Sequence, residues 1–74
     1  MGFKELRRKR MVAEIPGRLV SSRAGISTSR LSEVERGLVP SAPDELERIE
    51  RALDYLIAAR QKVAAVAAEV GWPL

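Results

Sequence analysis

Residues 27 to 36 gather side chains that donate and accept hydrogen bonds around only two large apolar residues, Leu31 and Val34. The polar members of this segment are Ser27, Thr28, Ser29, Arg30, Ser32, Glu33 and Arg36. Catalysis by a serine or threonine nucleophile needs an activating base. The chain has no histidine and no cysteine, and its serines and aspartates form no catalytic arrangement. We therefore expect no enzyme activity, no metal site and no cofactor, and we interpret the segment as a recognition surface.

Two helices are predicted upstream of this segment to hold it in place. The first covers residues 3–11, where apolar residues recur at positions 3, 6 and 11 among lysines and arginines. The second begins at Pro16, because a proline in the first helical turn sacrifices no hydrogen bond, and it extends to about Arg23. Its inward residues are expected to be Leu19, Val20 and Ala24.

A tight turn follows and leads into the third helix. Gly25 stands where the end of a helix needs a positive φ, and Ile26 is expected to be buried in the turn. Ser27 is a candidate N-cap for the third helix. The apolar residues of that helix share one face and are Leu31, Val34 and Leu38. Gly37 is expected to end the helix.

One long helix is predicted after the loop formed by residues 38–43. Residues 44–70 contain neither glycine nor proline. Ser41 and Asp44 resemble a capping box at the start of this helix, with aspartate in place of the usual glutamate. A break near residues 60 and 61 is the alternative to a continuous helix. The chain is thus expected to be all-α.

The second and third helices form a predicted helix-turn-helix unit. Its tight crossing needs a small residue at Ser21, a positive φ at Gly25 and four apolar anchors, all of which are present. The anchors are Val20, Ile26, Leu31 and Val34. The outward face of the third helix is then free to enter the major groove of DNA, which admits one α-helix.

The same residues resemble the phage-repressor and Cro-like (Xre-type) helix-turn-helix family. The resemblance covers about residues 3–56 and is most specific over residues 20–37, VSSRAGISTSRLSEVERG, and residues 46–53, LERIERAL. It implies a lambda-repressor-like helix-turn-helix domain of four to five helices with an extended C-terminal helix. Residues 1–56 then form the DNA-binding head, and residues 57–74 form a helical extension that is expected to dimerise.

The resemblance also implies roles for individual residues. Arg10 and Glu35 match an ion pair between the first and third helices of the family. The base readers map to Thr28, Ser29 and Glu33. Contacts to the DNA backbone or to bases map to Gly17, Arg18, Ser27, Arg30 and Arg36.

Elementary base-recognition chemistry suggests partners for some of these side chains. Arg30 or Arg36 could read guanine. Glu33 could accept a hydrogen bond from cytosine, and the Thr28 methyl group could contact thymine. The alternative for Glu33 is an ion pair with Arg30 or Arg36 at i,i+3 spacing, with no role in reading bases.

Three departures from the family remove some of its usual contacts. The second helix commonly opens with Ser or Thr and then Gln in that family, whereas this chain has Pro16 and Gly17. The backbone N–H of Gly17 can still meet a phosphate at the helix N-terminus. The loop after the third helix is often basic in that family, whereas it is uncharged in this chain. The chain has no asparagine, and its one glutamine is Gln61, so the usual readers of adenine are absent from the expected surface.

Charge is distributed unevenly along the chain. Residues 1–36 carry nine lysines and arginines against four acidic residues, whereas residues 37–74 carry four against six. A basic N-terminal half favours a polyanion as partner. The alternative is that these basic side chains are only solvated.

A heptad-like apolar seam runs along the long helix in steps of three and four residues. It consists of Ile49, Ala52, Leu56, Ala59, Val63, Val66 and Val70. The head is too small to cover the seam as far as Val70, so a dimer interface is expected over its outer part. The expected interface residues are Leu56, Ala59, Val63, Val66 and Val70. The alternative is a bent helix that folds back over the head and is closed by Trp72.

These expectations combine into a small homodimeric transcriptional repressor that binds double-stranded DNA at a palindromic operator, with half-sites about one helical turn apart. The alternative is a protein-interaction module, antitoxin-like or polymerase-binding, on the same scaffold. The uncharged loop and the missing glutamine favour that alternative, whereas the basic N-terminal half favours DNA. No signal peptide is readable, and no segment reaches the roughly 18 apolar residues of a membrane span. A cytoplasmic protein is therefore expected.

Overall fold

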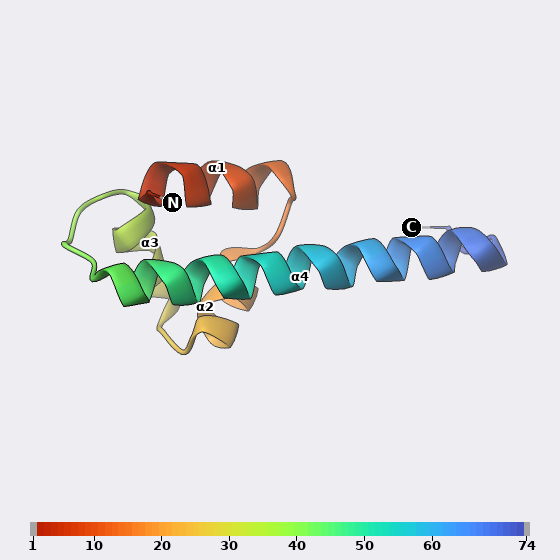
Figure 1. The fold of residues 1–74 in the computed structure, drawn as a ribbon. Coiled ribbons are helices and arrows are strands. Elements are labelled where there is room, and N and C mark those ends of the chain that lie inside the picture. Colours follow the sequence, from red (N-terminus) through yellow and green to blue (C-terminus); the bar gives the residue numbers. More distant parts are fainter. Residues whose placement is uncertain (1, 74) are drawn as a thin grey trace.

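A computed structural model describes residues 2–73, which form four α-helices and contain no strand. The helices are α1 (Phe3–Val12), α2 (Gly17–Ala24), α3 (Thr28–Glu35) and α4 (Pro43–Val70). The prediction of an all-α chain is thus confirmed. The three short helices pack beside the first half of α4, and the second half of α4 extends beyond them (Figure 1).

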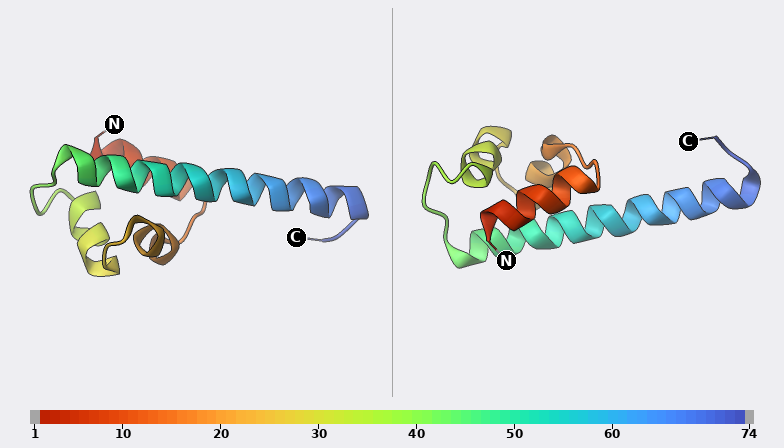
Figure 2. Two further views of the ribbon diagram at one scale, coloured as in Figure 1. Left: turned by 60° about the horizontal axis from the view of Figure 1, so that its bottom comes forward. Right: turned by 90° about the horizontal axis from the view of Figure 1, so that it is seen from above.

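A single apolar core holds the three short helices against α4. Its buried members are Leu6, Ile15, Val20, Ala24, Leu31, Val34, Ile49, Ala52 and Leu53. Every helix contributes to this core, and α1 and α2 each contact both α3 and α4. This unit corresponds to the expected head, residues 1–56, and Ile57 also packs against its core. Figure 2 shows that α2, α3 and the C-terminal turn lie on the same side of α4.

Local signals set the ends of the short helices. Pro16 lies in extended backbone immediately before α2, so the helix begins at Gly17. Gly25 ends α2 with a φ of 76°. Residues that carry a Cβ rarely adopt this left-handed backbone conformation. The Ser27 side chain accepts a hydrogen bond from the Arg30 backbone N–H at 3.0 Å and caps α3 as predicted.

The start of α4 differs from the prediction. Its N-cap is Ala42, which makes no side-chain cap hydrogen bond, and the expected capping box of Ser41 and Asp44 is not formed. Pro43 occupies the first turn, where its fixed φ favours the helix and its missing N–H costs no bond. The helix is continuous through residues 60 and 61 and ends at Gly71, whose φ is 71°.

Three apolar residues that were expected to face the core are exposed instead. Leu19 is 44 % exposed, because α2 buries the face formed by Val20, Ser21 and Ala24. Leu38 is 65 % exposed, because Gly37 has a φ of 69° and ends the helical periodicity one residue earlier. Met11 is exposed because the inward face of α1 runs from Leu6 through Arg10 to Ala13 in helical steps, and Met11 lies off that face. Ile26 is only partly buried and packs against the core from the turn.

Although α4 has 28 residues, no stretch of it is apolar enough to cross a membrane. The same holds for the other helices within residues 2–73.

Candidate nucleic-acid interface

The third helix presents a polar face to solvent while a narrow apolar face anchors it. Leu31 and Val34 are both buried in the core. Thr28 and Ser29 are exposed at the N-terminus of α3, and Glu33 lies partly buried one turn further on. Glu33 forms no ion pair within residues 2–73, although its charge acts on Arg30 at longer range and helps to raise the pKa of that guanidinium, after the larger effect of Glu45. The three predicted base readers therefore lie on one short helix, two of them exposed and the third partly buried.

The hydroxyl group of Thr28 also has a structural partner. Ser21, buried at the crossing of α2 and α3, lies 3.2 Å from Thr28 through the two side-chain oxygens. The Ser21 hydroxyl also donates to the Arg18 carbonyl oxygen at 3.1 Å. This pair joins the first turn of α3 to α2, so the small residue at position 21 has a polar role as well as a packing role.

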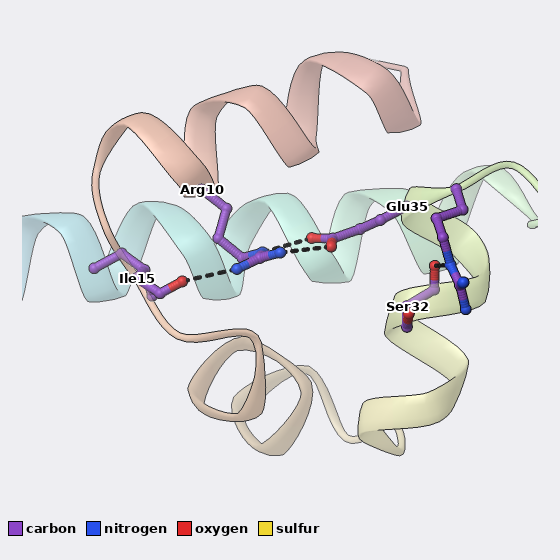
Figure 3. A network of polar contacts seen from close by, with 5 residues as sticks. Arg10, Ile15, Ser32 and Glu35 are labelled. Atoms are coloured by element: carbon purple, nitrogen blue, oxygen red, sulfur yellow. Dashed lines mark hydrogen bonds and ion pairs between the residues drawn. The ribbon is translucent and has the colours of Figure 1, made fainter.

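A two-point ion pair joins α1 to the end of α3 (Figure 3). Arg10 Nε donates to Glu35 Oε2 at 2.7 Å, and Arg10 Nη2 donates to Glu35 Oε1 at 2.8 Å. The third nitrogen, Nη1, donates to the Ile15 carbonyl oxygen at 3.1 Å. The hydrogen bonds with Glu35 raise the pKa of Arg10 above its ordinary value. Arg10 thus fixes α3 and the approach to α2 at the same time.

Arg30 makes a second two-point ion pair, which the sequence did not reveal. Its Nε and Nη2 donate to the two carboxylate oxygens of Glu45 at 3.0 and 2.8 Å. Nη2 also donates to the Pro40 carbonyl oxygen at 3.1 Å. The hydrogen bonds between Arg30 and Glu45 hold the pKa of Glu45 below its ordinary value and raise the pKa of Arg30. Arg30 therefore ties α3 to the following loop and to α4.

The remaining residues assigned to the DNA backbone lie at helix ends. Gly17 and Arg18 form the first turn of α2, which has no side-chain cap, so its N–H groups are not occupied by a capping side chain. The side chain of Arg18 is exposed. Arg36 is exposed at the C-terminus of α3, where its Nε donates to the Ser32 carbonyl oxygen at 3.3 Å. Arg36 is therefore less committed to internal contacts than Arg30.

Two hollows on the head combine cationic and apolar side chains. The larger, about 760 Å³, lies between α1 and the end of α3 and includes Phe3, Met11 and Val12 together with Lys4, Arg7, Arg8 and Arg36. The second, about 620 Å³, lies between α2 and α4. Here the guanidinium of Arg23 stacks over the Tyr55 ring at 3.3 Å from its centroid, a cation–π contact that nothing in the sequence spacing indicated.

The expected dimer seam divides into a covered part and an exposed part. Leu56 packs against the core and Ala59 is half-buried. Beyond them the exposed fractions of Val63, Val66 and Val70 are 60, 58 and 68 %. The alternative of a helix bent back over the head does not occur, because α4 runs without interruption to Val70.

The C-terminal turn folds back on α4 itself. The Trp72 backbone N–H donates to the Ala67 carbonyl oxygen at 2.7 Å, and Ala67 is buried. Trp72 then borders an almost wholly apolar hollow of about 420 Å³, together with Lys62, Val63, Val66, Ala67 and Val70. The turn therefore deepens the exposed seam and leaves most of it uncovered.

Within residues 2–73, no three acidic side chains are grouped closely enough to hold a metal ion. Comparison of the chain with protein-family models, curated proteins and solved structures gives no match.

Proposed function

We propose that this chain is a lambda-repressor-like helix-turn-helix protein that binds double-stranded DNA through α3. The observation that carries the proposal is the division of α3 between two faces. Leu31 and Val34 anchor the helix in the core, whereas Thr28 and Ser29 stand exposed at its N-terminus. The major groove of B-form DNA accepts one α-helix, and hydroxyl and carboxylate groups match hydrogen-bonding groups on base edges. The resemblance to the Xre-type family supports the same interpretation.

In this proposal the polar residues have separate tasks. Thr28, Ser29 and Glu33 read base edges. The backbone N–H groups of the first turn of α2, at Gly17 and Arg18, meet a phosphate, because a helix N-terminus attracts anions. Further backbone contacts come from Ser27 and Arg36. Arg30 acts at a distance from the bases, by fixing the loop and α4 through Glu45 and Pro40.

The proposal includes a homodimer that acts as a transcriptional repressor on a palindromic operator. The exposed seam over Val63, Val66 and Val70 supports the dimer, because contiguous apolar surface at one end of a small chain is typical of an interface. A dimer holds two copies of α3 in fixed positions, so each half-site adds to the binding energy. Residues 1–56 then read DNA, and residues 57–74 join the subunits.

DNA binding is tested by titrating the purified protein against random duplex DNA at two salt concentrations. We expect affinity to fall as salt rises, because lysines and arginines release counterions from DNA. Selection of binding sites from a random pool is the second step, and we expect enrichment of a two-fold symmetric sequence. The absence of both salt-dependent binding and enrichment would exclude the proposal.

A protein-interaction module on the same scaffold is the second candidate. The observation that favours it is the 760 Å³ hollow beside α1, where exposed Met11 and Val12 accompany four basic residues. Here the apolar side chains can pack against the apolar face of an amphipathic partner, and the basic side chains can pair with its acidic groups. Met11→Glu is expected to weaken the binding of such a partner without changing α3. Affinity for DNA, in contrast, is expected to respond to substitutions on α3.

A further inference from the structure

We propose that the exposed end of α4 binds a second copy of this chain in antiparallel orientation, with Val63 of each subunit facing Val66 of the partner. The inference rests on the homodimer of the proposed function and deepens it by stating how the subunits are arranged. Three observations lead to it: the side of α4 on which the seam lies, the residues that remain exposed there, and the charges along its edge.

The exposed seam continues the face of α4 that the head covers, but it turns by about 60° over the three heptads from Ile49 to Val70, because a straight helix drifts by about 20° per heptad. Ile49 and Ala52 belong to the seam and are buried in the core, whereas Val63, Val66 and Val70 continue the same steps of three and four residues and are exposed. The C-terminal turn also lies on the side where α2 and α3 lie (Figure 2). A partner helix that covers the seam therefore lies close to the side of α4 that carries the head.

This placement works against a close parallel pair. In a parallel dimer the two seams face each other along their whole length, with helix axes about 8–10 Å apart. Both heads would then have to fit between the two helices, although the molecule is about 20 Å across even perpendicular to its long axis. In an antiparallel pair, each head lies beyond the C-terminal end of the partner helix, and only the free ends overlap.

The seam residues define a register for the antiparallel pair. When Val63 faces Val66 of the partner subunit, Val70 faces Ala59 of the partner subunit, a small residue that leaves room next to the head. Both copies of the three exposed valines are then covered. The apolar hollow beside Trp72 receives side chains of the partner helix.

Charges along one edge of the seam fit this register. Lys62 and Glu69 are exposed, and neither forms an ion pair within residues 2–73. Both precede a seam residue by one position, and in antiparallel coiled coils such edge positions face each other. The register places Lys62 opposite Glu69 of the partner subunit, twice by symmetry. A parallel pair would place Lys62 opposite Ala67 and form no such ion pair.

The arrangement sets the separation of the two copies of α3. Arg30 of α3 contacts Glu45, which lies about 20 residues before the two-fold axis between residues 63 and 66. At about 1.5 Å per residue, the two recognition helices lie roughly 45–60 Å apart. One turn of DNA is about 34 Å, so we expect half-sites more widely spaced than the one turn expected from the sequence.

Disulfide crosslinking distinguishes the two orientations, because the chain contains no cysteine of its own. The test uses Val70→Cys and Ala59→Cys as separate proteins, mixed and oxidised without DNA. Antiparallel pairing predicts a disulfide between the two variants. It predicts none within Val70→Cys alone, since its two sulfurs would lie about 16 Å apart along the helices and a disulfide needs Cα atoms within about 7 Å. Efficient crosslinking of Val70→Cys with itself would overturn the orientation.

Charge reversal provides an independent test of the register. Lys62→Glu sets like charges against each other at two symmetric sites, and we expect self-association measured by sedimentation to weaken about five- to tenfold. The double variant Lys62→Glu/Glu69→Lys restores opposite charges and is expected to regain the parental affinity. Absence of this rescue contradicts the register, and a parent that stays monomeric at high concentration excludes the second copy. Neither the crosslinking nor the sedimentation measurement involves DNA. A failure of the proposed dimer is therefore distinguishable from a failure of DNA binding.

Discussion

Arg10 and Glu35 form a two-point ion pair, at 2.7 and 2.8 Å, across the space between α1 and α3. The side chains are 20 and 8 % exposed, so both charges are largely withdrawn from water. Arg10 also donates to the carbonyl oxygen of Ile15, two residues before α2 begins, so the same side chain holds the segment that leads into α2. One arginine therefore sets the relative positions of three helices.

Removal of Arg10 is expected to destabilise the head strongly. Arg10→Met leaves the Glu35 carboxylate without its partner in a poorly solvated place, which costs up to about 3–5 kcal/mol when such a pair is fully buried. Urea unfolding monitored by circular dichroism measures the loss. The double variant Arg10→Met/Glu35→Leu is the control and should recover much of the stability, because it leaves no unpaired charge. A single variant as stable as the parent would show that the pair contributes nothing.

Stability should depend on pH through Glu45. The Arg30 guanidinium lowers the pKa of Glu45 in the folded protein, so the ion pair stabilises the fold above the unfolded-state pKa of about 4.3. This contribution is lost as the pH falls through the lower, folded-state pKa. We expect Glu45→Gln to be less stable than the parent at pH 7 and to approach it in acid. A stability difference that stays constant from pH 7 to pH 2 would contradict this assignment.

Glu33→Gln is the sharpest probe of base reading. The change keeps the side-chain shape, removes a negative charge, and replaces an acceptor suited to cytosine with a donor and acceptor suited to adenine. We expect non-specific affinity to rise slightly and the preferred base to change at one symmetric position, by about 1–3 kcal/mol for a good contact. Selection of binding sites on parent and variant measures both effects. Identical preferred sites would remove Glu33 from the reading surface.

Arg36→Ala should affect all DNA sequences alike. Arg36 is exposed at the end of α3, and in our proposal it holds a phosphate. Its loss is expected to weaken binding uniformly and to reduce the slope of log affinity against log salt by about one. Arg48→Ala, on α4, is the matched control and should leave the slope unchanged. A change of sequence preference in Arg36→Ala would assign it to a base instead.

Val63→Glu is expected to give a helical monomer. It places a charge in the centre of the exposed seam, where association would bury it. Operator affinity should fall together with the dimer, because one half-site supplies only part of the binding energy. Ala65→Glu, an exposed position off the seam, is the control and should remain dimeric. Sedimentation and circular dichroism distinguish loss of association from loss of folding.

The sequence by itself determined the helices and the turn between α2 and α3. Gly25 adopts a positive φ and Ser27 caps the next helix because both effects depend on a few neighbouring residues. The long α4 follows from the absence of glycine and proline over residues 44–70. The exposure of Val63, Val66 and Val70 also follows, because a short head cannot extend along the whole of α4.

Only the tertiary structure decided which polar side chains are engaged inside the molecule. Arg30 was expected at the DNA surface, yet it contacts Glu45, 15 residues further along the chain. Arg23 and Tyr55 meet across α2 and α4 in the same way. Such pairs depend on the angle at which helices pack and on the direction each side chain takes from the backbone, whereas periodicity and capping report only the helix on which a residue lies.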